Sequence, residues 1–160
     1  MYVKICSIKK LKYIFDDIDC ATTGAILCSS YPIDKSEFER LNSFIAFGFD
    51  DISVAKESSF NSNIANDIKN YVDGLSKQID TLYVCCDSGE SRSTALAAAI
   101  TRYIGEKDKY IWNNPQYHPN PLVYRIQCEV FGLKTSKLKI RRLVCANDLA
   151  LKRAIKKGKY

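Results

Sequence analysis

TLYVCCDSGESRSTALAAAITRYI, residues 81–104, is the stretch that decides the fold expected for this 160-residue chain. Its first part, Thr81–Cys85, is a short apolar run of the kind found in buried parallel strands. Its last part, Arg92–Ile104, is rich in alanine and is followed by Gly105, so it is expected to be a helix that ends at a glycine. The polar residues 86–91 therefore form a strand-to-helix connection.

This connection and the start of the helix read CDSGESRS, with a cysteine six positions before an arginine. A loop that enters a helix from a parallel strand aims several backbone N–H groups at one point, and that point binds anions such as phosphate. The same groups favour Cys86 as a thiolate, which is the nucleophilic form. Gly89 permits the tight turn, and the guanidinium of Arg92 can bind two phosphoryl oxygens. Ser93 is placed to donate a hydrogen bond to the sulfur.

The loop resembles the phosphate-binding loop of cysteine-dependent protein tyrosine and dual-specificity phosphatases, whose pattern is His-Cys-x2-Gly-x2-Arg-Ser/Thr. Cys86, Gly89, Arg92 and Ser93 match that pattern in register. Three further segments, AILCSSYP, FGFDDI and PNPLVYRIQCEVFGL, resemble parts of small bacterial phosphatase-like proteins. The similarity covers roughly residues 20–133, and residues 1–133 are expected to form a phosphatase-like domain.

The resemblance implies a mechanism without a metal or other cofactor. Cys86 attacks phosphorus and forms a phosphocysteine, while Arg92 and the loop N–H groups hold the phosphoryl oxygens. A separate aspartate protonates the leaving oxygen and then activates water. Asp51 occupies the family's acid position in FGFDDI, and the neighbouring Asp50 is the alternative. The residues expected to bind phosphate are Asp87, Ser88, Gly89, Glu90, Ser91 and Arg92.

Two features depart from the family pattern. Cys85 stands where the family has a histidine that orders the loop, and its position at a strand end predicts simple packing. Asp87 and Glu90 add negative charge inside the loop, where related lipid phosphatases tend to carry lysine. The two acids therefore argue against a polyanionic inositide substrate.

The resemblance implies a phosphatase that acts on phosphotyrosine in proteins or peptides, with phosphoserine and phosphothreonine as further substrates. The main alternative is a phosphate-binding module with a phosphatase fold and little or no activity. Sulfur transfer, arsenate reduction and RNA 5′-phosphatase activity are weaker alternatives. The pair Arg92-Ser93 disfavours sulfur transfer, and the position of the loop far from the N-terminus disfavours arsenate reduction. Only the basic tail favours RNA 5′-phosphatase activity.

The remaining apolar pattern alternates between strand-like and helix-like segments, which predicts an α/β domain. Besides Thr81–Cys85, the expected strands are Tyr2–Ser7, Ala25–Cys28 and Ser43–Phe49. The expected helices are Lys9–Ile18, a segment capped by Asp34 and running to Leu41, Phe60–Ile79 capped by Ser58 or Ser59, Arg92–Ile104, a segment from Asn120 or Pro121 to Phe131, and Asn147–Lys157. The expected fold is a three-layer α-β-α sandwich with a mostly parallel sheet of four or five strands, like that of phosphotyrosine protein phosphatases.

Composition and charge set the wider expectations. Hydrophobic residues make up 46% and charged residues 26%, which is ordinary globular usage and excludes a disordered chain or a coiled coil. Residues 134–160 carry ten basic residues and one acid, although the whole chain carries a net charge of only +6. We expect this extension to be helical and packed on the same domain. Its basic face is either solvated or in weak contact with an anionic surface.

The seven cysteines and the N-terminal sequence bear on location. An odd number of cysteines and no export signal argue against a disulfide framework and favour a reducing cytoplasm. No apolar stretch is long enough to span a membrane. The expected partner is a phosphorylated protein or peptide, and the sequence leaves the oligomeric state open.

Overall fold

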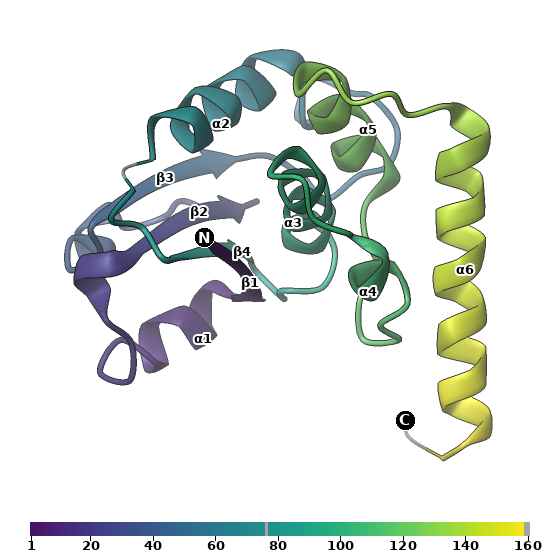
Figure 1. The fold of residues 1–160 in the computed structure, drawn as a ribbon, viewed down its shortest axis with the longest axis horizontal. Helices are drawn as coiled ribbons and strands as arrows, with labels where there is room; N and C mark the ends of the chain where they lie inside the picture. Colours follow the sequence, from purple (N-terminus) through teal and green to yellow (C-terminus); the bar gives the residue numbers. More distant parts are fainter. Residues whose placement is uncertain (76, 159–160) are drawn as a thin grey trace.

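The computed structural model describes residues 1–75 and 77–158, and it shows a four-stranded sheet with helices on both faces (Figure 1). All neighbouring strands are parallel, and their order is β1-β4-β2-β3. The strands are β1 (Tyr2–Ser7), β2 (Thr23–Ser29), β3 (Ser43–Gly48) and β4 (Thr81–Cys86). The helices are α1 (Ile8–Tyr13), α2 (Ser62–Gly74), α3 (Arg92–Tyr103), α4 (Lys109–Trp112), α5 (Pro121–Val130) and α6 (Lys137–Lys156). The predicted α/β class is confirmed.

Burial explains the order of the strands. The central strands β2 and β4 are buried along almost their whole length, whereas the edge strands β1 and β3 are largely half-buried or exposed. Successive side chains of a strand point to opposite faces of a sheet. Cys85 accordingly packs in the apolar layer under α1, and Cys86 packs in the layer under α2, α3 and α5. The carboxyl end of β4 thus delivers Cys86 to the start of α3.

All four strands, α3 and α5 lie within two residues of their predicted bounds. The helix predicted over Lys9–Ile18 is wrong in extent, because α1 begins at Ile8 and ends at Tyr13. Two aspartates follow it, and negative charge at the carboxyl end of a helix opposes the helix dipole. The chain turns there instead, with the N–H of Asp17 donating to the carbonyl of Ile14 at 3.0 Å.

The segment after Asp34 is also shorter than predicted. Asp34 does cap it, since its carboxylate accepts a hydrogen bond from the Ser36 N–H at 3.0 Å. The cap opens only a single 3-10 turn, Lys35–Phe38, and not a helix that reaches Leu41. The side chain of Phe38 is fully buried, which fixes this turn against the sheet face that α1 covers.

The long helix predicted over Phe60–Ile79 is wrong at both ends, because α2 spans Ser62–Gly74 and its cap is Asn61. Ser59, a predicted cap, is engaged elsewhere: its hydroxyl donates to the Lys56 carbonyl at 2.6 Å and closes the loop before α2. Residue 76 of the predicted helix, like residues 159–160 of the basic extension, lies outside the described residues.

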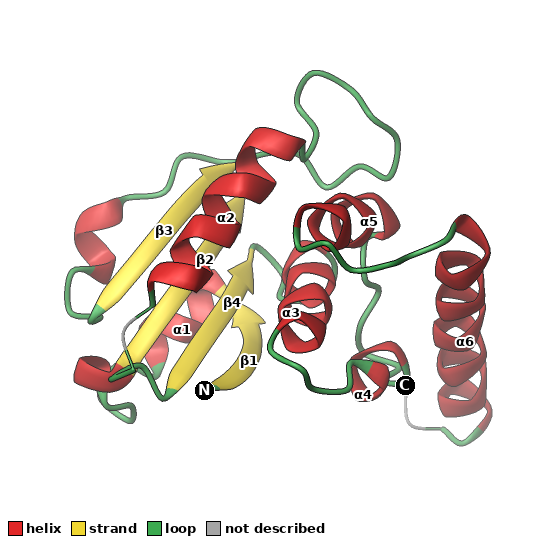
Figure 2. Cartoon of the chain, turned by 45° about the horizontal axis from the view of Figure 1, so that its top comes forward, coloured by secondary structure: helices red, strands yellow, loops and turns green. Residues whose placement is uncertain are grey.

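The last helix begins ten residues earlier than the predicted Asn147, because Ser136 caps α6 before the basic residues of its first turns. Asn147 lies inside the helix and is buried. Its amide donates to the carbonyls of Trp112, Asn114 and Tyr117 at 3.1, 3.3 and 2.8 Å, which ties α6 to the unpredicted helix α4 and the turn after it. Figure 2 shows α6 on the far side of α4 and α5 from the sheet. Within the described residues, no helix combines the length and the apolar character needed to cross a membrane.

Candidate active site

The connection between β4 and α3 forms a loop around the sulfur of Cys86, whose side chain is buried. The N–H of Gly89 donates to Cys86 Sγ at 3.3 Å, and Ser93 Oγ lies 3.1 Å from the same sulfur. The structure thus brings together three of the residues that the sequence motif singled out, with two hydrogen-bonding groups at the sulfur.

Gly89 fits the loop because it has no side chain. Its φ is +80°, a conformation that residues with a Cβ rarely adopt. A Cβ at this position would lie 2.6 Å from the carbonyl carbon of Cys6 and 2.6 Å from the nitrogen of Ser7. The loop therefore packs directly against the end of β1, and this contact holds the Gly89 N–H over the sulfur.

Replacing Gly89 by alanine is expected to lower the free energy of unfolding by about 2 kcal/mol or more, through the positive φ together with the clash. Gly105→Ala is the matched control, because Gly105 has a φ of +87° and a Cβ there would meet nothing within 4 Å. Urea unfolding of both variants measures the difference. Equal losses would contradict the close packing of Gly89 on β1.

Arg92, at 4% exposure, holds its guanidinium beside the loop with hydrogen-bond acceptors for two of its three nitrogens. Nη1 donates to the carbonyl of Phe49 at 2.7 Å and to Ser30 Oγ at 3.1 Å, and Nη2 donates to Asp87 Oδ2 at 2.5 Å. Nε is buried and has no hydrogen-bond acceptor among the described residues. A buried N–H without an acceptor is unfavourable, so Nε is available for an oxygen of a bound anion.

The carboxylate of Asp87 is the charge partner of this arginine. Burial opposes its ionisation, but hydrogen bonds from Ser29 and Arg92 outweigh burial and hold the pKa of Asp87 below its usual value. Asp87 is therefore ionised at neutral pH and offsets the positive charge of Arg92. The side chain faces the arginine, which leaves the backbone N–H as the group that Asp87 can offer to phosphate.

Asp51 lies at the edge of the same loop. Its Oδ1 accepts hydrogen bonds from Ser91 Oγ at 2.9 Å and from Asn120 Nδ2 at 2.8 Å, and its Oδ2 lies 3.9 Å from Arg92 Nε. Asn120 was predicted only to open a helix. Its Oδ1 does cap α5, and that role turns its Nδ2 toward Asp51 and the carbonyl of Ile52. A capping asparagine, unlike a capping aspartate, keeps an amide free for a second contact, which is the signal that could have identified it.

Asp50, the alternative acid, is placed differently. Its N–H donates to the carbonyl of Ser58 at 2.9 Å, and it forms a parallel bridge with Ser59 across the loop that follows β3. Among the described residues, no hydrogen bond joins its carboxylate to the loop after β4. Of the two neighbouring aspartates, Asp51 is the one in contact with that loop.

The remaining loop residues shape the backbone. Ser88 and Glu90 are exposed, and the Glu90 N–H donates to Ser88 Oγ at 3.2 Å. The Glu90 carbonyl accepts hydrogen bonds from Thr94 Oγ1 at 2.7 Å and from the N–H of His118 at 2.8 Å. These two bonds tie the loop to the first turn of α3 and to the segment before α5.

Cys85 faces the opposite layer and does not take part in this loop. Its Sγ lies 3.5 Å from Cys6 Sγ on the neighbouring strand β1. Burial, followed by the Cys6 contact, raises the pKa of the Cys85 thiol well above its usual value. Cys85 is thus a neutral, packed thiol at the end of β4.

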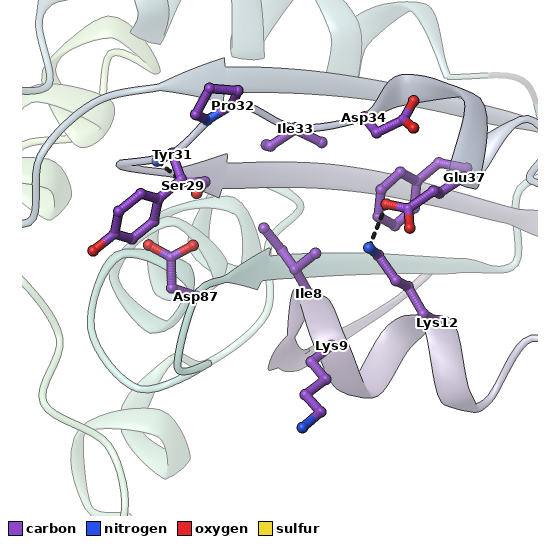
Figure 3. A pocket seen from close by; sticks show the side chains of 11 residues that line it. Ile8, Lys9, Lys12, Ser29, Tyr31, Pro32, Ile33, Asp34, Glu37 and Asp87 are labelled. Carbon is purple, nitrogen blue, oxygen red and sulfur yellow. Dashed lines mark hydrogen bonds and ion pairs between the residues drawn. The ribbon is translucent and has the colours of Figure 1, made fainter.

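A cavity of about 310 Å³ opens beside the loop (Figure 3). At one end, the ring of Tyr31 lies beside Asp87, and an ion pair between Lys12 and Glu37 lies farther along (Figure 3). Tyr31 is 72% exposed, so its ring is open to a ligand. The cavity offers an aromatic surface and groups of both charges, and Asp87 of the loop after β4 forms part of its wall.

The fold and this site define an α/β protein whose parallel sheet presents a buried cysteine at the loop between β4 and α3. No protein-family model matches the chain, and no curated protein matches it. Three solved structures are similar to this chain. They are the catalytic domain of the PP-IP phosphatase SIW14 from S. cerevisiae in complex with citrate, with 11% identity over 98% of this chain and 88% of that chain at a TM-score of 0.45, and two structures of PTPMT1. PTPMT1 alone shows 12% identity over 97% of this chain and 95% of that chain at a TM-score of 0.41, and its complex with PI(5)P shows 13% identity over 96% and 94% at 0.42.

Proposed function

We propose that this protein is a cysteine-dependent phosphatase that hydrolyses phosphotyrosine in proteins or peptides. The observation that carries the proposal is the surroundings of Cys86 Sγ. The sulfur meets the Gly89 N–H and the Ser93 hydroxyl, and the Nε of Arg92, six residues along the chain from Cys86, is buried with no hydrogen-bond acceptor among the described residues. A phosphoryl group above the sulfur would supply oxygens to Nε and to the loop N–H groups.

In the first step, the Cys86 thiolate attacks phosphorus and forms an S–P bond while the P–O bond to the phenol breaks. Asp51 in its acid form gives its proton to the departing phenolate oxygen. In the second step, the Asp51 carboxylate takes a proton from water as the water oxygen attacks phosphorus. The S–P bond breaks, the thiolate is restored and inorganic phosphate leaves.

Phosphotyrosine is favoured among phosphate esters by the aromatic surface beside the loop. The exposed ring of Tyr31 is well placed to pack against a substrate phenyl ring, and the adjoining cavity of about 310 Å³ has room for one. Phosphoserine and phosphothreonine lack a ring that could use this surface and are expected to be poorer substrates.

The alternative, a phosphate-binding module with little activity, has one observation in its favour. Asp87 is ionised and lies 2.5 Å from Arg92 Nη2, so part of the positive charge that would stabilise a phosphoryl group is already offset. A bound phosphate would have to share this arginine with Asp87.

Hydrolysis of matched phosphotyrosyl and phosphoseryl peptides, with EDTA and a thiol reductant present, tests the proposal. We expect metal-independent release of phosphate from both peptides, with kcat/KM about tenfold higher for the phosphotyrosyl peptide because only its ring can pack on Tyr31. Folded protein that binds phosphate but releases none from either peptide would establish the binding module in its place. Equal rates for the two peptides would contradict the role given to Tyr31.

A further inference from the structure

A second cavity, of about 430 Å³, opens next to the segment that carries Asp51. Its walls come from three parts of the chain: residues 53–55 of the loop between β3 and α2, the start of α5 and the first turns of α6. Figure 2 shows this loop extending beside α5, with α6 on the other side of α5. The cavity therefore joins the basic C-terminal helix to the edge of the candidate active site.

The cavity is positively charged. Arg125, Lys137 and Arg141 line it, and none of its nine lining residues is acidic. Lys137 and Arg141 are four positions apart on α6, so they face the same side of the helix and repel each other. In the part of the chain that the structure describes, neither of them pairs with a carboxylate, and Arg125 has only a distant contact with Glu129 at 3.8 Å. A bound anion would offset this uncompensated charge.

The rest of the lining is mostly apolar. Val54, Leu122 and Ile140 provide aliphatic walls beside the three cations, and Val54 is 66% exposed. A glutamate side chain in a peptide matches both parts, because its methylene groups can pack on the walls while its carboxylate meets the cations. A polyhydroxylated headgroup would leave the aliphatic walls without an apolar partner. The lining thus favours an acidic peptide over a phosphoinositide.

The cavity and the candidate active site share their supports. Asn120 donates to Asp51 Oδ1 at 2.8 Å and to the Ile52 carbonyl at 3.1 Å. The next residue after Ile52 and the next residue after Asn120 both line the cavity. A peptide with its phosphorylated residue in the loop would therefore carry neighbouring residues toward this cavity.

We propose that the basic cavity formed by Arg125, Lys137 and Arg141 binds acidic residues that flank the phosphorylated residue of a peptide substrate. This inference deepens the proposed function and rests on it. It assigns a role to the start of α6, where Lys137 and Arg141 have no carboxylate partner among the described residues, and it makes an acidic sequence context the feature that selects substrates.

Two phosphotyrosyl peptides test the inference, one with glutamates and the other with glutamines on both sides of the phosphotyrosine. At low salt we expect wild-type protein to show a kcat/KM about fivefold higher for the glutamate peptide, with the preference falling toward one in 0.5 M NaCl as roughly expected for partly exposed charge pairs. The double variant Lys137→Gln/Arg141→Gln should lose the preference. The double variant Lys152→Gln/Lys156→Gln should keep it, because it removes the same charge with the same spacing farther along α6.

Several results would overturn the inference. One is equal rates of wild-type protein on the two peptides, and another is an equal loss of preference in both double variants, which would assign the effect to the overall charge of the helix. A third result combines two observations: the wild-type protein shows no preference between the peptides, and it binds phosphatidylserine vesicles whereas the Lys137→Gln/Arg141→Gln variant does not. That result would assign the surface to a membrane.

A failure of the proposed function is distinguishable from a failure of this inference. Binding of the two peptides to the Cys86→Ser protein, measured by fluorescence anisotropy, does not depend on turnover. Tighter binding of the glutamate peptide, abolished only by Lys137→Gln/Arg141→Gln, would support the basic cavity even if wild-type protein hydrolyses nothing. Equal affinities would overturn it.

Discussion

Cys86→Ser is expected to reduce the hydrolysis of p-nitrophenyl phosphate by roughly 10⁴-fold or more, the scale seen when an enzyme loses its nucleophile. The serine hydroxyl is close in size to the thiol and can keep the contacts with Gly89 and Ser93, so the loop should remain folded. A hydroxyl is a far weaker acid than a thiol, and none of the hydrogen bonds at Cys86 Sγ joins it to a carboxylate or a histidine that could take its proton. The attack on phosphorus therefore fails while phosphate binding persists.

The measurement is steady-state turnover with EDTA and reductant, combined with acid quenching during turnover to trap phosphorylated protein. Wild-type protein should carry an acid-stable phosphoryl group that Cys86→Ser protein lacks. Cys145→Ser is the control, because Cys145 is exposed on α6 and should be dispensable for turnover. Substantial turnover by Cys86→Ser protein would exclude this cysteine as the nucleophile.

The loop between β4 and α3 was predictable because the residues that define it lie close together in the sequence. Gly89, Arg92 and Ser93 lie within seven residues of Cys86, and the strand before them and the helix after them are strong patterns on their own. Long-range partners were not predictable in the same way. Asn120 reaches Asp51 across 69 positions, and nothing in the spacing of the two residues indicates that contact.

The caps of helices were also predictable only where the capping contact is local. Asp34 was predicted correctly because its carboxylate accepts a hydrogen bond from Ser36, two residues away. Ser59 was predicted wrongly because its hydroxyl donates to the carbonyl of Lys56 and does not cap α2. The start of α6 was missed because the basic residues near Lys137 resemble a solvated tail. Its position depends on the buried amide of Asn147, whose three carbonyl acceptors lie more than 25 positions away.

The sequence also did not indicate that Asp87 would compete with a bound anion for Arg92. Asp87 and Glu90 are both acids of the loop, yet Asp87 pairs with the guanidinium whereas the exposed Glu90 lies outside the ion pairs found among the described residues. The difference arises from the loop backbone, which turns the Asp87 carboxylate toward Arg92. Without that geometry, the two acids would be expected to have the same effect on anion binding.

The acid is the second position where a large effect is expected. Asp51→Asn should lower kcat/KM for a phosphotyrosyl peptide by roughly 10²-fold, which is the lower end of the contribution of a general acid. The asparagine can still accept hydrogen bonds from Ser91 and Asn120, so the loop keeps its support while the proton donor is lost. Asp50→Asn is the matched control, one residue away and expected to change the rate little, because the structure ties Asp50 to Ser58 and Ser59 and not to the loop.

The choice of ester separates proton donation from a structural role of Asp51. Because p-nitrophenolate is a much weaker base than the phenolate of tyrosine, it leaves without protonation, and Asp51→Asn should slow p-nitrophenyl phosphate hydrolysis far less than hydrolysis of the peptide. Equal losses on both esters would show that Asp51 positions the loop through Ser91, and a larger loss in Asp50→Asn protein would move the acid to the neighbouring residue.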